Sequence, residues 1–285
     1  MKTDNYHESV MIHEVLEALH VKNQALYIDA TLGTGGHTLE ISKLGGQVLG
    51  IEADSKMLSI AKERLVNANP TPKLVHGNFM DIEKIVKDNG YDKVSGILFD
   101  LGVSNLHLTT DDRGFSFSNP DLPLDMRLDA KTQGVSASDL LNALREDQLI
   151  DLFAVTMDPG SAKWIARRVV ENRGFKTFEK VSDLLEICRE LKSKPTLNSA
   201  TLPFLALRIA VNSELDNLFK VLPIAYDLLD EGGRLVVISF HSEEDRIVKR
   251  FMANFGPNEL ILPSHEEIEK NPRSRSAKMR FLEKK

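Results

Sequence analysis

Short apolar runs alternate with segments of helical spacing in the first third of the chain, and few folds allow that alternation. Four runs have the length of a strand: Leu26–Ile28, Val48–Ile51, Lys73–Val75 and Val94–Phe99. Between them apolar residues recur three or four positions apart, as in Met57, Ile60, Ala61 and Leu65. Strands that alternate with helices of about 10–15 residues are typical of βαβ units. The sequence therefore predicts an α/β fold with a Rossmann-like parallel sheet.

The alternation stops near residue 105 and resumes near residue 196. Residues 105–129 are polar and aperiodic, and from Ser136 to Lys194 the apolar spacing is helical without a strand signal. We therefore expect an inserted, mostly helical domain over 105–195 within a domain formed by 1–104 and 196–285. In the second part, Phe204–Leu229 reads as one long amphipathic helix, followed by strands over Arg234–Phe240 and Lys278–Leu282.

Composition excludes several classes of protein. Hydrophobic residues are 42% and charged residues 27% of the 285, which is typical of a globular chain and not of a disordered or collagen-like one. A net charge of -6 argues against a uniformly basic protein that wraps nucleic acid. The single cysteine, Cys188, allows no internal disulfide. No secretory signal is visible and no apolar run approaches the ~18 residues of a membrane span, so we expect a soluble, cytoplasmic protein without a membrane partner.

A glycine loop, Ile28–His37, follows the first predicted strand. Glycines there allow a ligand to approach the backbone, and the next helix N-terminus offers a positive dipole end. A dinucleotide site would need a third glycine where Thr38 stands. An S-adenosylmethionine site needs an acid at the strand end, where Asp29 could hold the cationic end of the cofactor. Both cofactor classes stay open on this loop alone, as does a plain structural turn.

Two further residues fit a nucleoside cofactor. Glu52 ends the second predicted strand, where a carboxylate can accept both ribose hydroxyls. Phe79 lies just beyond the third strand, where it could stack on adenine or simply pack in the core.

The fourth predicted strand ends at Asp100, at the same sheet edge as the glycine loop. An exocyclic amine on a base has its lone pair delocalised into the ring, and an oxygen that accepts its N–H restores its nucleophilicity. Asp100 could supply that oxygen, or could cap the next turn. His241 leaves the last parallel strand at this edge and is a candidate substrate contact or proton relay, although a lone histidine is more often structural. The eight histidines show no metal-ligand spacing, so no protein-built metal site is expected.

Basic residues gather in two segments of this acidic chain. Between Lys163 and Lys180, and again between Lys270 and Lys285, basic residues exceed acidic ones. Such islands suggest phosphate contacts, although a solvated charged face gives the same pattern.

Several motifs together carry a family resemblance. They are Asp29–His37, Asp100–Ser104, Arg113–Phe117, Pro123–Arg127, Ala206–Ile209, Gly232–Leu235, Ser239–Ser242 with Glu244–Arg246, and Asn271–Ala277. In this order they resemble the bacterial 16S ribosomal RNA cytosine-N4 methyltransferases, the RsmH (MraW) family. The resemblance implies a class I S-adenosylmethionine-dependent methyltransferase fold with an inserted helical domain. It also implies methylation of a cytosine in the decoding region of 16S rRNA, with the small ribosomal subunit as partner.

The same resemblance assigns the cofactor site to Gly35, Gly36, His37, Glu52, Phe79, Asp100 and His107. Glu52 stands where the family usually has Asp, and His107 stands where Gln is usual. On this reading Asp100 and His241 are the candidate catalytic residues and S-adenosyl-L-methionine is the cofactor. Two rival hypotheses are an NAD-dependent oxidoreductase and a non-catalytic ribosome-assembly factor on a methyltransferase fold.

Overall fold

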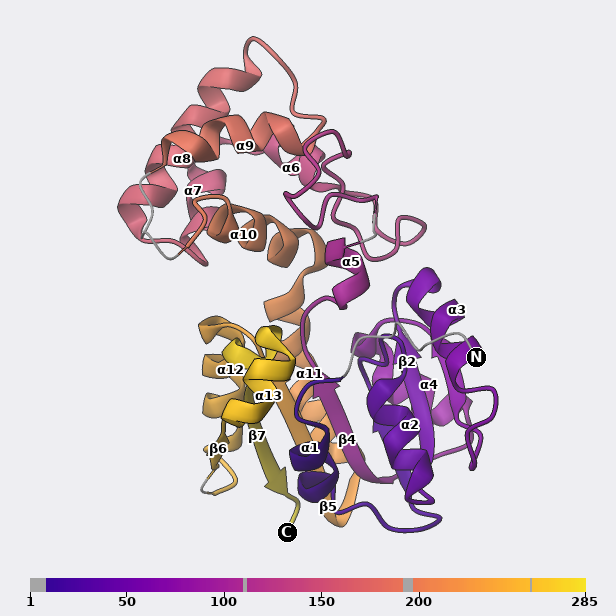
Figure 1. Ribbon diagram of the computed structural model, residues 1–285. Helices are drawn as coiled ribbons and strands as arrows, with labels where there is room; N and C mark the ends of the chain where they lie inside the picture. Colours follow the sequence, from indigo (N-terminus) through magenta and orange to yellow (C-terminus); the bar gives the residue numbers. More distant parts are fainter. Residues whose placement is uncertain (1–8, 110–111, 192–196, 257) are drawn as a thin grey trace. The chain divides into compact units, whose positions relative to one another are not determined.

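The computed structural model describes residues 9–109, 112–191, 197–256 and 258–285. The chain forms two compact units: Met1–Val103 with Leu215–Lys285, here called the sheet unit, and Ser104–Glu214, called the helical unit (Figure 1).

The sheet unit contains a seven-stranded sheet in the order β3-β2-β1-β4-β5-β7-β6. The strands are β1 (Leu26–Asp29), β2 (Gln47–Glu52), β3 (Lys73–His76), β4 (Val94–Asp100), β5 (Leu229–Ser239), β6 (Leu260–Ile261) and β7 (Lys278–Glu283). The first five run parallel, whereas β7 is antiparallel to both β5 and β6. The predicted α/β fold with a Rossmann-like, mainly parallel sheet is confirmed.

The strand order reverses between β1 and β4, which are direct neighbours. In open α/β sheets, ligands bind outside the carboxyl ends of the strands at such a switch point. Asp29 ends β1 and Asp100 ends β4, so both residues stand at this place in the sheet.

Alternate residues of the central strands enter two separate cores. In β4, Ile97 and Phe99 belong to one core, while Leu98 between them belongs to the other. Because helices cover both faces, these strands are apolar throughout, which explains why they form continuous apolar runs in the sequence. The helices of this unit are α1 (Ile12–Leu19), α2 (Gly36–Lys43), α3 (Ser55–Arg64), α4 (Ile82–Asp88), α11 (Glu214–Leu228), α12 (Ser242–Met252) and α13 (His265–Lys270), with 3-10 turns η1 (Phe79–Asp81) and η2 (Pro272–Ser276).

The helical unit consists of α-helices joined by loops. They are α5 (Asn105–Thr109), α6 (Ala137–Ala143), α7 (Glu146–Ala154), α8 (Pro159–Arg173), α9 (Val181–Glu190) and α10 (Thr201–Asn212). Local sequence fixes their starts: the Asp158 side chain caps α8 ahead of Pro159, and Ser136 and Asp139 form a capping box on α6. These capping residues mark where two of the helices predicted from the apolar spacing begin.

The expected single helix over Phe204–Leu229 is wrong. Ser213 adopts a left-handed conformation (φ 50°) and separates α10 from α11. Because α10 packs on α6 and α7, the helical unit extends to Glu214, beyond the boundary at residue 195 that the change in pattern suggested. Across the described residues, helices that are both long and apolar enough to span a bilayer are absent.

Candidate active site

The glycine loop joins β1 to α2 at the switch point. Gly33 (φ 54°) and Gly35 (φ 80°) occupy the left-handed region, and a Cβ on Gly35 would lie 2.6 Å from Leu65 Cδ1. Gly36 begins α2, and a Cβ there would lie 1.9 Å from Ser9 Oγ. Larger residues would therefore push the loop away from its neighbours and change the start of α2.

Asp29 stabilises the glycine loop through hydrogen bonds. Its side chain is buried, Oδ2 accepts a hydrogen bond from Thr38 Oγ1 (2.7 Å), and Oδ1 accepts one from Thr31 N (3.4 Å). Burial raises the pKa of the Asp29 carboxyl, which these hydrogen bonds and His37 partly counteract. The carboxylate thus binds the loop itself, whereas the sequence had suggested that it holds the cationic end of a cofactor. Thr38, where a dinucleotide site would have glycine, is one of its two partners.

Glu52 lies at the end of β2, beside the same loop. Its Oε2 accepts a hydrogen bond from Gly33 N (2.7 Å), and its Oε1 accepts one from Asp54 N (2.8 Å). Burial raises the pKa of this carboxyl to about 8. A carboxylate has about four lone-pair positions, so one remains on each oxygen for a ligand hydroxyl.

Phe79 begins η1, and its ring meets the ring of Phe99 edge-on, with centroids 5.6 Å apart. The side chain is only partly buried, so part of the ring stays accessible. Its stacking on adenine stays a prediction.

Asp100 is the last residue of β4 and has an unusual environment. Its main-chain N–H donates to Thr31 Oγ1 (2.6 Å), which ties the strand end to the glycine loop. Within the part of the chain that the structure describes, Asp100 Oδ1 is buried and makes no hydrogen bond. Burial raises the pKa of the Asp100 carboxyl to about 6, with smaller contributions from nearby acids. A perturbed carboxyl at a ligand-binding edge is typical of functional sites.

His37, in the first turn of α2, lies against Asp100. Its ring is buried, with Nδ1 3.7 Å from Asp100 Oδ2 and Nε2 2.9 Å from the carbonyl oxygen of Val10. The structure thus brings together His37 and Asp100, two of the predicted site residues.

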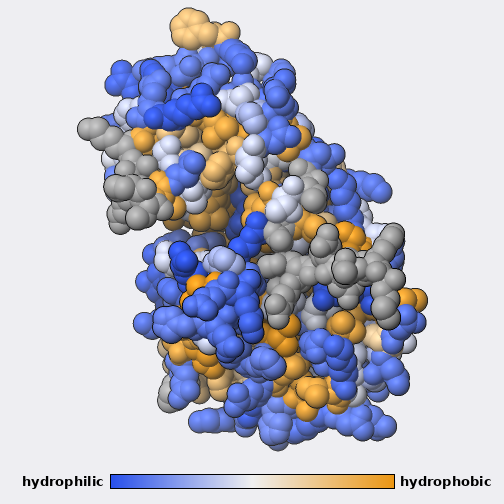
Figure 2. Space-filling view, in the orientation of Figure 1, coloured by the Kyte–Doolittle hydropathy of each residue, from blue (hydrophilic) through white to orange (hydrophobic). Residues whose placement is uncertain are grey.

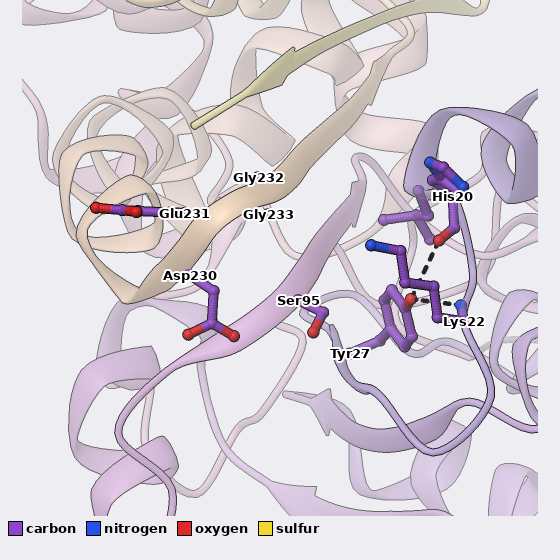
Figure 3. A pocket seen from close by; sticks show the side chains of 9 residues that line it. His20, Lys22, Tyr27, Ser95, Asp230, Glu231, Gly232 and Gly233 are labelled. Atoms are coloured by element: carbon purple, nitrogen blue, oxygen red, sulfur yellow. Dashed lines mark hydrogen bonds between the residues drawn. The ribbon is translucent and has the colours of Figure 1, made fainter. Parts of the chain in front are cut away.

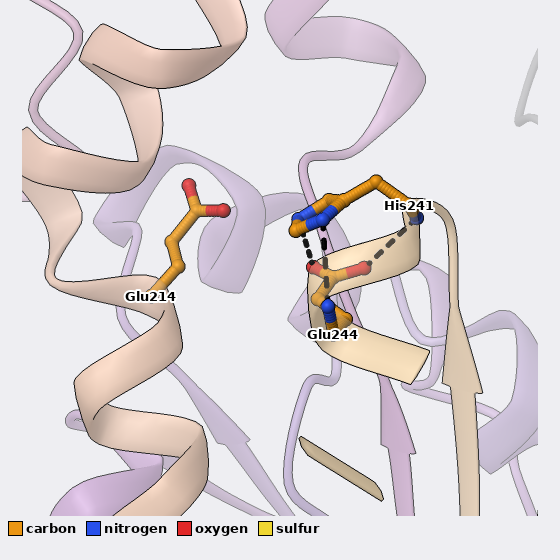
Figure 4. A group of neighbouring side chains, drawn as sticks. All are labelled: Glu214, His241 and Glu244. Carbon is orange, nitrogen blue, oxygen red and sulfur yellow. Dashed lines mark hydrogen bonds and ion pairs between the residues drawn. The ribbon is translucent and has the colours of Figure 1, made fainter. Parts of the chain in front are cut away.

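His241 caps the N-terminus of α12, and Figure 4 shows its ring beside Glu244. Its Nε2 lies 3.1 Å from Glu244 Oε1, while Glu244 Oε2 accepts hydrogen bonds from the main-chain N–H groups of Phe240 and His241. The structure gives His241 a structural role, and its contact with a substrate stays a prediction.

Glu244 and Glu267 lie near Asp100 and both raise its pKa. The sequence analysis does not identify either of them as a site residue. The spacing His241-x-x-Glu244 resembles a capping box and could have pointed to Glu244. Glu267 is on α13, in a segment that carries no local signal for the site.

His107 lies in the helical unit, on the short helix α5, where its buried ring is 5.1 Å from the ring of Phe115. The loop Arg113–Arg127, here called the motif loop because it carries two of the family motifs, is also held by hydrogen bonds within the helical unit. Arg113 Nη1 donates to the carbonyl oxygens of Arg127 and Leu128, and the Arg127 guanidinium pairs with Asp125 (2.7 Å). Contacts of His107 and this loop with a ligand stay predictions.

A cavity of about 60 Å³ lies elsewhere in the sheet unit (Figure 3). It is lined by residues at the start of the central strands, among them Tyr27 of β1, Ser95 of β4 and Asp230 of β5. The amino ends of parallel strands are opposite the edge that carries Asp100, so this cavity is separate from the candidate site.

Many basic residues of the two basic segments form ion pairs and hydrogen bonds with other residues of the protein. In the helical unit, Arg173 Nη1 donates to the carbonyl oxygen of Leu141. Ion pairs join Arg167 to Glu171, Arg168 to Glu190, and Lys176 to Asp183. In the C-terminal segment Arg280 is buried against Asp245 (2.7 Å), and Lys284 donates to main-chain carbonyls. Exposed cations remain in both segments, including Lys163 and Arg275.

Comparison with known proteins identifies the family. The MraW methylase family matches residues 4–285. The Ribosomal RNA small subunit methyltransferase H of Dictyoglomus thermophilum is 39% identical, over 100% of this chain and 98% of that protein. The proteins of the same name from Clostridioides difficile (38% identical, 98% of this chain, 99% of that protein) and Methylacidiphilum infernorum (41%, 96% and 93%) are equally similar. The predicted family is confirmed, and a methylase excludes the oxidoreductase alternative: this chain belongs to the MraW methylase family.

Proposed function

We propose that this protein transfers a methyl group from S-adenosyl-L-methionine to N4 of a cytosine in the decoding region of 16S rRNA, in the cytoplasm. The observation that carries the proposal is the carboxyl of Asp100 at the switch point of the sheet, with one buried oxygen that makes no hydrogen bond to any described residue. Relatives that match the whole chain are named as small-subunit rRNA methyltransferases.

The residues around the glycine loop fit the cofactor. Glu52 keeps one lone pair on each oxygen for the two ribose hydroxyls, and Phe79 offers a partly accessible ring to the adenine. Gly35 and Gly36 leave the start of α2 without side chains beyond Cα. The bound cofactor supplies an electrophilic methyl group on a sulfonium.

Asp100 acts on the target amine. Its Oδ1 accepts one N–H of the cytosine amine, which draws the nitrogen lone pair out of the ring. The same oxygen takes the proton that the nitrogen loses when it gains the methyl group. A cytosine in structured RNA must first leave its stack, at a cost of a few kcal/mol.

The helical unit and the basic segment Lys270–Lys285 would bind the RNA, and the motif loop Arg113–Arg127 and His241 would contact the target base. Phe175, just after α8, is 95% exposed and belongs to the basic segment Lys163–Lys180 of the sequence. Figure 2 shows hydrophilic residues over much of the visible surface of this unit. An exposed aromatic ring among cations is suited to stack on an unpaired base.

Replacing Phe175 by Ala is therefore expected to raise the KM for undermethylated small subunits about tenfold, because one base–aromatic stack contributes ~1–3 kcal/mol. Phe175→Trp should keep the wild-type KM. Phe219, 67% exposed on α11, provides the matched control Phe219→Ala. Equal KM values for the two alanine variants would argue against this contact.

Replacing Glu52 by Gln is expected to weaken binding of the cofactor about tenfold, because the amide nitrogen replaces one of the two oxygens that accept main-chain hydrogen bonds, and a buried donor left without a partner costs ~1–3 kcal/mol. Isothermal titration calorimetry with S-adenosylmethionine measures the change, and thermal unfolding checks that the loop is intact. Glu63→Gln, on the exposed face of α3, is the control. Unchanged affinity in the Glu52 variant would remove the ribose assignment.

The overall proposal is tested by incubating the purified protein with labelled S-adenosylmethionine and small subunits from cells that lack the enzyme. Digestion and mass spectrometry should locate the label in N4-methylcytidine of 16S rRNA. If the protein binds the subunits but leaves them unlabelled, and the Asp100→Asn gene restores a deletion strain fully, the assembly-factor alternative holds instead.

A further inference from the structure

The two ring nitrogens of His37 face different partners. Nε2 lies 2.9 Å from the carbonyl oxygen of Val10. A carbonyl oxygen can only accept a hydrogen bond, so Nε2 must carry a hydrogen. The bond to Val10 therefore fixes which nitrogen is left to face Asp100.

The segment that supplies this carbonyl is itself held in place. Ser9 lies against Gly36, and the main-chain N–H of Met11 donates to Glu267 Oε1 (2.8 Å). The His37 ring is only 4% exposed. Turning the ring over would break the bond to Val10 in a buried place, so the orientation of His37 is well determined.

The other nitrogen, Nδ1, is 3.7 Å from Asp100 Oδ2. If the ring were neutral, the lone pair of Nδ1 would face the lone pairs of a carboxylate. A proton on Nδ1 turns this contact into an ion pair between an imidazolium and Asp100. The geometry thus favours a state in which the pair holds one proton.

Among the described residues, three acids also act on Asp100. Asp29 faces it from β1, Glu244 from α12 and Glu267 from α13. Burial and these three carboxylates raise the pKa of Asp100, whereas His37 lowers it. A carboxylate among acids needs a nearby cation to stay ionised in the neutral range.

We propose that His37 is a positioning residue for Asp100: its protonated Nδ1 holds Oδ2 and keeps the carboxylate ionised, which leaves Oδ1 for the target amine. This inference rests on the proposed function. When the amine nitrogen gains its methyl group, one N–H bond breaks, its electron pair stays on nitrogen, and the proton goes to Asp100 Oδ1. His37 loses no proton in this step. Its positive charge favours the ionised form of Asp100 before the amine reacts.

The first test is the pH profile of single-turnover methyl transfer to small subunits. In the wild type the rate should rise with pH around a midpoint near 6, where Asp100 ionises. In His37→Gln the midpoint should move up by about one pH unit, so that the rate at pH 6 falls more than the rate at pH 8.5. His13→Gln, exposed on α1, should keep the wild-type midpoint. A uniform loss of rate with an unchanged midpoint would mean that His37 is only scaffold.

The second test does not depend on activity. Nitrogen-15 NMR of the wild type should show Nε2 of His37 protonated at every pH between 5 and 8, and Nδ1 protonated at pH 6. An Nδ1 without a proton throughout this range would overturn the inference. Absence of methyl transfer by the wild type would refute the proposed function and leave this NMR result standing.

Discussion

Replacing Asp100 by Asn should lower the single-turnover rate of methyl transfer by about two to four orders of magnitude, the usual contribution of a positioned acid–base group. Asn has nearly the same shape but cannot take up a proton, and its neutral amide draws weakly on the N–H of the target amine. Affinity for S-adenosylmethionine should change far less than the rate. Rapid-quench assays on undermethylated small subunits, paired with calorimetry, measure the two quantities separately.

The same variant should be more stable than the wild type above pH 6. An unfolded Asp has a pKa of about 3.9, and the folded protein raises the pKa of Asp100 to about 6. This group's contribution to stability is complete below about pH 4 and is lost as the pH rises through 6, because folding then buries a charge. Asp100→Asn avoids that loss and should gain about 1–3 kcal/mol at pH 8.

Thermal unfolding at pH 4 and pH 8 shows the gain, which should be absent at the lower pH. Asp88→Asn, at the exposed end of α4, controls for a change of net charge. A rate within threefold of the wild type would exclude Asp100 as the group that activates the amine. A rate loss accompanied by lower stability at pH 8 would instead indicate that the carboxylate supports the strand end.

The place of the active site was predictable because it depends on topology. Parallel strands buried on both faces must be apolar throughout, so Val94–Phe99 stands out in the sequence as a continuous apolar run. Residues at the ends of such strands share one sheet edge. Asp29, Glu52 and Asp100 were therefore placed together from the sequence, and the structure confirms that all three end their strands there.

The roles of individual charges could not be predicted, because they depend on contacts between distant segments. Asp29 and Arg280 are both buried and bonded to the protein's own groups, and no local pattern distinguishes them from ligand-binding residues. The break at Ser213 was missed for a related reason. The residues around it keep an amphipathic spacing and contain neither glycine nor proline, so only the packing of α10 against α6 and α7 reveals the turn.

Replacing Gly114 by Ala should unfold the motif loop of the helical unit at a much lower temperature than in the wild type. Gly114 has φ 74°, and a Cβ there would lie 2.4 Å from the main-chain oxygen of Pro123. The main chain on both sides of Pro123 is held by the bridge to Lys180, in which Leu124 N donates to Glu179 O and Val181 N donates to Leu122 O. A left-handed conformation costs Ala ~1–2 kcal/mol, and overpacking costs typically ~1–3 kcal/mol more.

Because backbone blocks the new Cβ, no side-chain rotation can relieve the collision, and the loop from Arg113 to Arg127 must move. Gly134 lies in the same unit, and a Cβ there would have no described atom within 4 Å, so Gly134→Ala should be neutral or slightly stabilising. The chain's single tryptophan, Trp164, is on α8, and its fluorescence reports unfolding of the helical unit. Coincident melting curves for the two variants would show that the Gly114 loop adapts at little cost. A lower melting temperature for Gly114→Ala alone, together with loss of methyl transfer to subunits, would link the rigidity of this loop to recognition of the RNA.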